Sequence, residues 1–396
     1  MSSLFSWLKK DKAADKLEPD AVSVRMLPST GFAFRLFEKL NPGERNFAVC
    51  PYGARVVLGM LFEASTGDTR KEMAEALDFD EDPNSNTNWY ERLGRPLEFR
   101  LETERRGLEM LTANSLWCDD GFLPKEDYAT ALKEHYWAEI RALSFSAPDA
   151  ADKVNKWAEE KTRGRIRGLV SSLQENSPLW ASNAVYFKGL WITPFEADET
   201  KVEEFTLQSG VKELVTMMRR SGEFSYVERG GSQIVRLPYQ GGMSMCIILP
   251  KRDVSFRNFC AELRSNVDTF TGAMAGRPGH VRLPKFRIET EVELSAPLKA
   301  MGMGQVFEPA RAALEKISEV KPLFLRGVLQ KDFVEVNEKG TEAAAVTEAF
   351  CELAHESEPP APPFEMIVDR PFVFAICDDF TRTVMFLGAV VDPLET

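Results

Sequence analysis

Helix-like and strand-like segments occupy separate blocks of this chain, and this arrangement restricts its possible folds more than any other feature. Before Pro178, apolar residues mostly recur at helical spacing. After Pro178, short runs rich in β-branched and aromatic residues are bounded by glycine, proline or charged turns. A regular alternation of strand and helix, which is typical of parallel α/β sheets, is absent. The sequence therefore predicts an α+β fold with largely antiparallel sheets.

The periodic segments give the expected elements, and no linker-like stretch divides them. The predicted helices cover residues 30–40, 56–63, 69–77, 154–170 with an interruption at Gly164, 255–267 and 294–301. The predicted strands cover residues 180–187, 222–227, 234–237, 244–249, 280–288, 333–336, 372–376 and 384–391. Residues 80–88 are acidic and polar, which predicts a loop. We expect one domain over residues 29–396, preceded by an N-terminal extension over residues 1–28.

The composition is that of a folded protein with an acidic balance of charge. Of the 396 residues, 44% are hydrophobic, which excludes a disordered chain and supplies a sizeable core. The 61 acidic and 49 basic side chains leave a formal net charge of -12. Because nucleic acids and anionic membrane surfaces attract basic patches, neither is expected as the main partner.

The cysteines and the N-terminus bear on the compartment. The six cysteines are scattered without a CxxC pair or a metal-ligand spacing: Cys50, Cys118, Cys246, Cys260, Cys351 and Cys377. Buried thiols of this kind are typical of a reducing compartment. The first residues lack the order of a secretory signal, and no apolar stretch reaches the roughly 18 residues of a membrane span. A cytoplasmic location is favoured, with unconventional export or a missing leader as the alternative.

No catalytic, cofactor-binding or metal-binding constellation stands out. The three histidines, His135, His280 and His355, lie outside any nucleophile or zinc signature. Gly302 and Gly304 form a GxG that the next residues do not extend to a dinucleotide fingerprint. The carboxylates have no spacing that selects a catalytic pair. An enzyme, a cofactor and a metal are therefore not expected.

Residues 337–363 carry two conflicting signals. In an extended conformation, one face has only small uncharged residues: Thr341, Ala343, Ala345, Thr347, Ala349 and Cys351. The other face has Glu342, Ala344, Val346, Glu348, Phe350 and Glu352. This parity is typical of a strand that buries one face in a sheet and leaves its carboxylates in water.

Local propensity points the other way for the same residues. Alanine and glutamate favour helices, so propensity predicts an exposed helix after the strand at 333–336. A segment in which parity and propensity disagree is a candidate for two conformations. The prolines between Pro359 and Pro363 end the part that is able to enter a sheet.

The same segment resembles a known family. Its residues Glu338-Lys339-Gly340-Thr341-Glu342-Ala343-Ala344-Ala345 resemble the proximal hinge of an inhibitory serpin. Further matches follow the family order: residues 183–189 with Trp191, Leu283-Pro284-Lys285-Phe286, and Pro371, Phe372, Phe374 and Gly388. In serpins, Asn183 and Trp191 would belong to the breach and shutter region of the main sheet. Several independent motifs in the right order are far more specific than one, and they extend the resemblance over nearly the whole chain.

The resemblance implies a serpin fold of three β-sheets and about nine helices, with an exposed reactive-centre loop over about residues 338–365. It also implies a metastable, monomeric inhibitor of serine-type endopeptidases, whose partner is the target endopeptidase. The protease attacks the loop, its nucleophile forms an acyl-enzyme, and the cleaved loop inserts as a new strand before deacylation. Small hinge residues suit this step because a charged side chain would have to be buried quickly.

Family spacing from Gly340 places the reactive bond at Ala354–His355. A small residue at this position predicts elastase-like target proteases with small primary pockets. Leu353 is the alternative, and it predicts chymotrypsin-like enzymes or cross-class inhibition of cysteine proteases.

Some residues depart from the family pattern. The usual Ser-Pro with a second nearby serine in the shutter is replaced by Cys50, Pro51 and Gly53, and Gln330 stands where a histidine is usual. The hydrogen bonds under the main sheet must therefore be rearranged. This motivates the alternative of a non-inhibitory serpin with a binding, chaperone or storage function. Residues 88–104 mix both signs of charge, so heparin activation is not expected.

Overall fold

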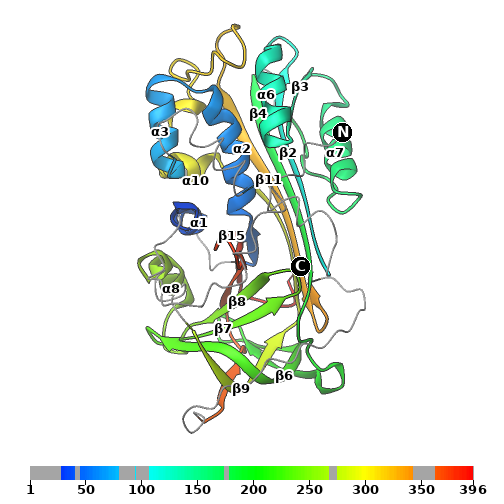
Figure 1. Cartoon of the computed structure of the whole chain (residues 1–396), viewed down its shortest axis with the longest axis vertical. Helices are drawn as coiled ribbons and strands as arrows, with labels where there is room; N and C mark the ends of the chain where they lie inside the picture. The colour runs from blue at the N-terminus through cyan, green and yellow to red at the C-terminus, as the bar shows by residue number, and fades with distance from the viewer. Residues whose placement is uncertain are drawn as a thin grey trace, which may run out of the picture.

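The computed structural model describes residues 28–40, 45–79, 94, 107–173, 178–266, 274–341 and 362–395. Most helices gather towards one end of an elongated molecule, and long strands lead from there to a second sheet at the opposite end (Figure 1). The α+β class predicted from the sequence is confirmed.

The first sheet has six strands in the order β10-β11-β12-β4-β2-β3. The strands are β2 (Leu108–Asp119), β3 (Glu139–Leu143), β4 (Leu179–Leu190), β10 (Phe286–Glu293), β11 (Leu325–Asn337) and β12 (Gly340–Thr341). β4 and β11 run parallel, whereas β2 is antiparallel to β4 and β10 is antiparallel to β11. β12 lies between β11 and β4 at one end only. β2 and β4 are buried on both faces, as is expected of strands covered from both sides.

The second sheet has nine strands in the order β1-β15-β14-β8-β7-β6-β9-β13, with β5 attached to β6. The strands are β1 (Phe47–Val49), β5 (Lys201–Thr206), β6 (Lys212–Arg229), β7 (Ser232–Tyr239), β8 (Met243–Leu249), β9 (Ala275–Pro284), β13 (Phe364–Ile367), β14 (Phe372–Asp378) and β15 (Val384–Val390). β6 has 18 residues and pairs with β5, β9 and β7 along its length. Because β6 joins strands that would otherwise separate, the described strands form two sheets and not the three that the resemblance implied.

Seven α-helices lie in the described residues, compared with the nine implied. They are α1 (Pro28–Lys39), α2 (Pro51–Ala64), α3 (Gly67–Leu77), α6 (Glu126–Tyr136), α7 (Ala150–Lys161), α8 (Phe256–Glu262) and α10 (Ser295–Ala300). α2 is almost wholly buried and begins where Cys50 Sγ accepts a hydrogen bond from the Gly53 N–H. α7 covers the other face of the six-stranded sheet, where Trp157 meets Trp117 edge-on with ring centroids 5.4 Å apart.

Sequence patterns located most elements but misjudged several. The predicted strand 280–288 is two strands, β9 and β10, separated at Lys285. β2 lies in the block that was expected to be mostly helical. The sequence did not reveal it, because a strand buried on both faces lacks the alternation of apolar and polar residues. The helix predicted within 337–363 is wrong at Gly340–Thr341, which form a strand. Residues 342–361, and the loop predicted at 80–88, lie outside the described residues.

Two findings concern membrane and metal chemistry. None of the helices in the described ranges is long and apolar enough to cross a membrane. The same ranges contain no group of three histidine, cysteine, aspartate or glutamate residues that is able to hold a metal ion. The five cysteines among them form no disulfide, and Cys351 lies outside.

Candidate functional site

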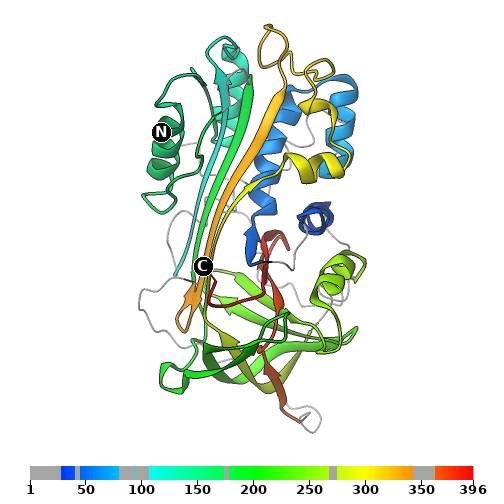
Figure 2. The ribbon, with the colours of Figure 1, turned by 180° about the vertical axis from the view of Figure 1, so that it is seen from behind.

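The candidate site is the seam between β4 and β11, defined here by their parallel pairing from Leu179 and Leu325 to Tyr186 and Phe333. Beyond this point the two strands separate, and β12 lies between them, antiparallel to both. Figure 2 shows β11 in orange ending in this short hairpin beside the green β4. An antiparallel strand forms hydrogen-bond ladders with neighbours on both sides. The seam is therefore a place where β12 can lengthen if β4 and β11 part.

The turn from β11 to β12 is held by the chain that follows β4. The Trp191 N–H donates to the Lys339 carbonyl over 3.0 Å, and the Phe195 N–H donates to the Glu338 carbonyl over 2.8 Å. The indole Nε1–H of Trp191 donates to the Asn337 carbonyl over 3.0 Å. Three hydrogen bonds thus fix the start of the segment that resembles a serpin hinge.

Glycine is required at the first position of β12. Gly340 has φ +145°, and a Cβ there would lie 2.0 Å from the Gly189 carbonyl oxygen. The next residue, Thr341, is fully buried, and its hydroxyl lies 2.8 Å from the Tyr239 hydroxyl. Trp191 stacks on Tyr239 with ring centroids 4.1 Å apart. The end of β12 is therefore packed and hydrogen-bonded in the core.

Glu338 anchors the same turn through charge. Its carboxylate lies 2.6 Å from the Lys285 ammonium and accepts a 2.9 Å hydrogen bond from the Thr200 hydroxyl. Burial works to raise the pKa of the Glu338 carboxyl, but the Lys285 and Thr200 hydrogen bonds hold it below its ordinary value. Glu338 is thus charged at neutral pH and ties the turn to the residue between β9 and β10.

A second set of polar side chains crosses the middle of the seam. The Gln330 amide donates to Asn183 Oδ1 over 2.5 Å and to the Cys50 carbonyl over 2.9 Å. The Asn183 amide donates in turn to Asn114 Oδ1 over 2.7 Å. A Cβ at Gly53 would lie 2.4 Å from Asn183 Oδ1, so glycine lets α2 approach this closely. The network links β11, β4 and β2 to the start of α2.

Asp332 lies next to this network. Its Oδ2 accepts a 3.0 Å hydrogen bond from the Cys50 N–H. Burial raises the pKa of the Asp332 carboxyl well above its ordinary value, and the Cys50 N–H opposes this only in part. Among the described residues, Asp332 Oδ1 and Gln330 Oε1 are buried without a hydrogen-bond partner. Such atoms typically cost about 1–3 kcal/mol each, so the closed seam is not fully stabilised.

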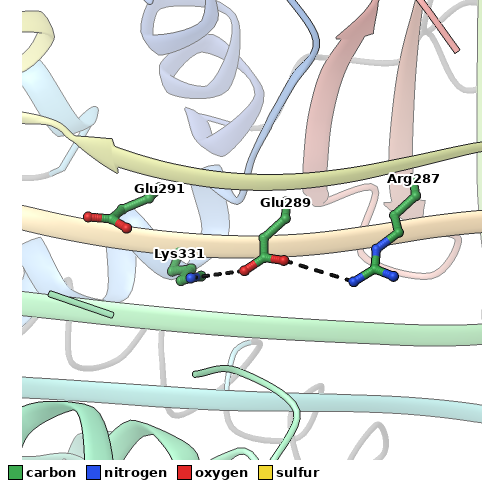
Figure 3. A pocket seen from close by; sticks show the side chains of 4 residues that line it. All are labelled: Arg287, Glu289, Glu291 and Lys331. Carbon is green, nitrogen blue, oxygen red and sulfur yellow. Dashed lines mark ion pairs between the residues drawn. The ribbon is translucent and has the colours of Figure 1, made fainter. Parts of the chain in front are cut away.

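The opposite face of the seam is tied to the loop that follows α7. The Lys331 ammonium donates to the carbonyls of Arg167 and Gly168 over 2.8 and 3.1 Å. It also lies 2.9 Å from the Glu289 carboxylate, which Arg287 approaches from the other side (Figure 3). These side chains and Glu291 line a shallow groove over β10 and β11. One buried lysine thus holds the loop after α7 against β11.

The predicted site residues that lie in the described ranges occupy two places on the seam. Glu338, Gly340, Thr341 and Trp191 surround its open end, and Cys50, Pro51, Asn183 and Gln330 lie at its middle. The remaining predicted residues lie outside the described ranges: Glu342, Ala343, Ala344, Ala345, Leu353, Ala354 and His355. Sequence reasoning missed Lys331, Asp332 and Tyr239 as members of the site. Asp332 lies two positions after Gln330, so on a strand both side chains are on the same face. This was the signal in the sequence that could have identified Asp332.

Comparisons with known proteins agree with this geometry. A family model described as Serpin (serine protease inhibitor) matches residues 28–393. A serpin-like protein of Thermococcus kodakarensis is 32% identical over 368 residues, covering 92% of this chain and 84% of the relative. The leukocyte elastase inhibitor of Xenopus laevis is 30% identical over 378 residues, covering 92% and 98%.

Solved structures show the same architecture. The crystal structure of mouse protein-Z dependent protease inhibitor matches with a TM-score of 0.81 at 26% identity, covering 92% of this chain and 96% of that chain.

Proposed function

Because the chain belongs to the serpin (serine protease inhibitor) family, we propose that it inhibits serine-type endopeptidases as a suicide substrate. In this mechanism the protease's serine oxygen attacks the carbonyl carbon of the reactive bond and expels the amine of the next residue, which leaves an acyl-enzyme. The freed N-terminal part of the loop then extends β12 down the seam. The attached protease is carried along and distorted before water hydrolyses the ester.

The position of β12 is the observation that carries this proposal. Two residues already lie between β11 and β4 in the orientation that an inserted strand needs. Continuing the register of Thr341 would place Ala343 between Phe187 and Val334, whose side chains are fully buried in the core. Small side chains fit such positions with little rearrangement, whereas bulky or charged ones do not.

The other face of an inserted strand meets α7. Continuing the same register would place Glu348 between Ser182 and Leu329. Both are buried, and Leu329 belongs to the cluster beneath α7. The expectation that all carboxylates on this face stay in water therefore holds only if α7 and its loop shift. The proposal thus includes a displacement of α7 during insertion.

The target class follows from the reactive bond, which we propose to be Ala354–His355, with Leu353 as the alternative. Alanine before the scissile bond suits an elastase-like primary pocket. The name of one relative, leukocyte elastase inhibitor, agrees with this class.

Incubation with pancreatic elastase and with chymotrypsin tests the proposal. The expected result is a covalent complex that survives SDS, with cleavage after Ala354 located by mass spectrometry. Thr341→Arg should convert the protein from inhibitor to substrate, since the fully buried Thr341 site would have to accept a charge. Thr130→Arg, on the exposed side of α6, is the matched control and should inhibit normally. Cleavage by both proteases without any complex would overturn the proposal.

The second candidate function is that of a non-inhibitory serpin. The closed Gln330 and Asn183 network across the seam favours it, because the strands are held together where insertion must part them. Loop cleavage separates the two functions. It should raise the melting temperature strongly if the loop inserts, and leave the temperature unchanged in a non-inhibitory serpin.

A further inference from the structure

Strand β5 lies beside both ends of the segment that we assign to the reactive-centre loop. Just before β5, the Thr200 hydroxyl donates to Glu338, in the turn between β11 and β12. At the other end of β5, the Thr206 N–H donates to the Asp369 carbonyl over 2.8 Å. Asp369 follows β13, through which the chain re-enters the second sheet. The residue before β5 and the last residue of β5 thus contact the two anchor points.

Ion pairs strengthen the connection to the second anchor. Glu203, in the middle of β5, lies 3.3 Å from Arg282 of β9. Arg282 in turn lies 3.1 Å from Glu365 of β13. The two ends of the chain between these anchors are thus bound beside the ribbon formed by β5 and β6, which we call the β5–β6 ribbon.

The two faces of the β5–β6 ribbon differ sharply. On the inner face, Phe205, Val215 and Met217 are buried in the core. On the outer face, Val202 and Leu214 are 66% and 65% exposed. Val202 pairs with Thr216, and Leu214 lies two positions before Thr216, so the two apolar side chains are diagonal neighbours.

The outer face also has a charged rim and one exposed apolar side chain in its turn. Glu204 and Lys212 form an exposed ion pair at 2.6 Å beside Leu214. Val211, in the turn between the strands, is 52% exposed. Single exposed apolar residues need no explanation, but an adjoining set with a charged rim has the character of a protein-binding surface.

We propose that the outer face of the β5–β6 ribbon is a second contact surface for the target endopeptidase. The proposal rests on the proposed function for its occupant: a protease that attacks the loop is bound to a segment whose two ends are anchored beside this ribbon. The protease would contact this surface through an apolar patch beside its active-site cleft. That patch would cover Val202 and Leu214. This contact raises the rate of the first encounter and leaves the chemistry at the reactive bond unchanged.

The test compares two double variants of the full chain. V202S with L214S removes the apolar surface of the β5–β6 ribbon. L123S with V320S removes two exposed apolar side chains at the opposite end of the molecule, where Leu123 is 66% and Val320 is 45% exposed. For each protein, the second-order rate constants for covalent complex formation and for loop cleavage by elastase and chymotrypsin are measured. A free peptide with the sequence of residues 346–361 serves as a substrate that lacks the ribbon.

We expect the V202S/L214S rate constants to fall about tenfold with at least one protease, as for the loss of one well-buried aliphatic contact. The L123S/V320S variant should match the unmodified protein, and the peptide should be cleaved more slowly than the intact loop. Equal rates for both double variants would overturn the inference. If V202S/L214S fails to fold, the isosteric Val202→Thr variant replaces it, with a smaller fall expected.

Failure of the proposed function looks different. Cleavage of the loop without a covalent complex would overturn inhibition, yet the cleavage rates of the two variants would still decide whether the ribbon contacts the protease. Resistance of the loop to both proteases would overturn both proposals.

Discussion

The hydroxyl groups of Tyr239 and Thr341 lie 2.8 Å apart, so a buried hydrogen bond joins the end of β7 to the end of β12. Removing either hydroxyl breaks this bond, and the Tyr239 hydroxyl then has only the weak acceptor Met245 Sδ at 4.0 Å. Tyr239→Phe and Thr341→Val should each lower the free energy of unfolding by about 1–2 kcal/mol. In a double-mutant cycle followed by urea unfolding, the two losses should not add. Strict additivity would show that this bond contributes nothing to stability.

Gly340→Ala should displace β12 from the seam. The added Cβ would meet the Gly189 carbonyl at 2.0 Å, and φ +145° is unfavourable for alanine. We expect faster amide hydrogen exchange at Trp191, whose N–H donates to Lys339, and a shift in tryptophan fluorescence. Gly121→Ala is the control, because the nearest atom to its added Cβ is 3.8 Å away. Unchanged exchange at Trp191 in the Gly340 variant would contradict this role of glycine.

Asp332 should make stability depend on pH. Because burial raises the pKa of its carboxyl in the folded state above the ordinary value of 3.8, the protonated form stabilises the fold. That stabilisation is complete below pH 3.8 and is lost as the pH rises through the folded-state pKa. The Asp332→Asn variant should not lose this stabilisation. The difference in free energy of unfolding between the variant and the unmodified protein should therefore increase in favour of the variant from pH 4 to pH 8. Asp253→Asn, at an exposed position, is the control. A constant difference between Asp332→Asn and the unmodified protein would refute the assignment.

Lys331→Met should release the loop that follows α7. It removes the donor to the Arg167 and Gly168 carbonyls while keeping the apolar stem of the side chain. We expect faster hydrogen exchange in residues 165–170 and, under the proposed mechanism, faster loop insertion after cleavage. Arg287→Met, in the same groove but half exposed, is the matched control and should change neither rate. Equal effects of the two variants would contradict a specific role of Lys331, because any change in the groove would then release the loop.

The sequence was informative where structure depends on neighbours in the chain. The small-residue parity predicted that the segment after β11 is able to enter a sheet, and its first residues, Gly340–Thr341, form β12; β7 and β8 were found from short runs between turns. The sequence did not identify Lys331 and Asp332 as site residues. Their roles depend on the Arg167 carbonyl and the Cys50 amide, which are 164 and 282 positions away. β2 escaped because a strand covered on both sides has no alternating pattern to read.

The pairing of β4 with β12 also sets the number of residues that a strand filling the seam would need. Thr341 is level with Gly189, and β4 begins ten positions earlier, at Leu179. A strand that filled the whole seam would therefore need about ten residues after Thr341 and would end at Cys351, the last member of the small-residue face. Deleting one residue near the start of that stretch would exchange the two faces of all the residues that follow, so glutamates would point into the core. Under the proposed mechanism, the length of the segment from residue 342 to residue 351 is therefore constrained as strictly as its composition.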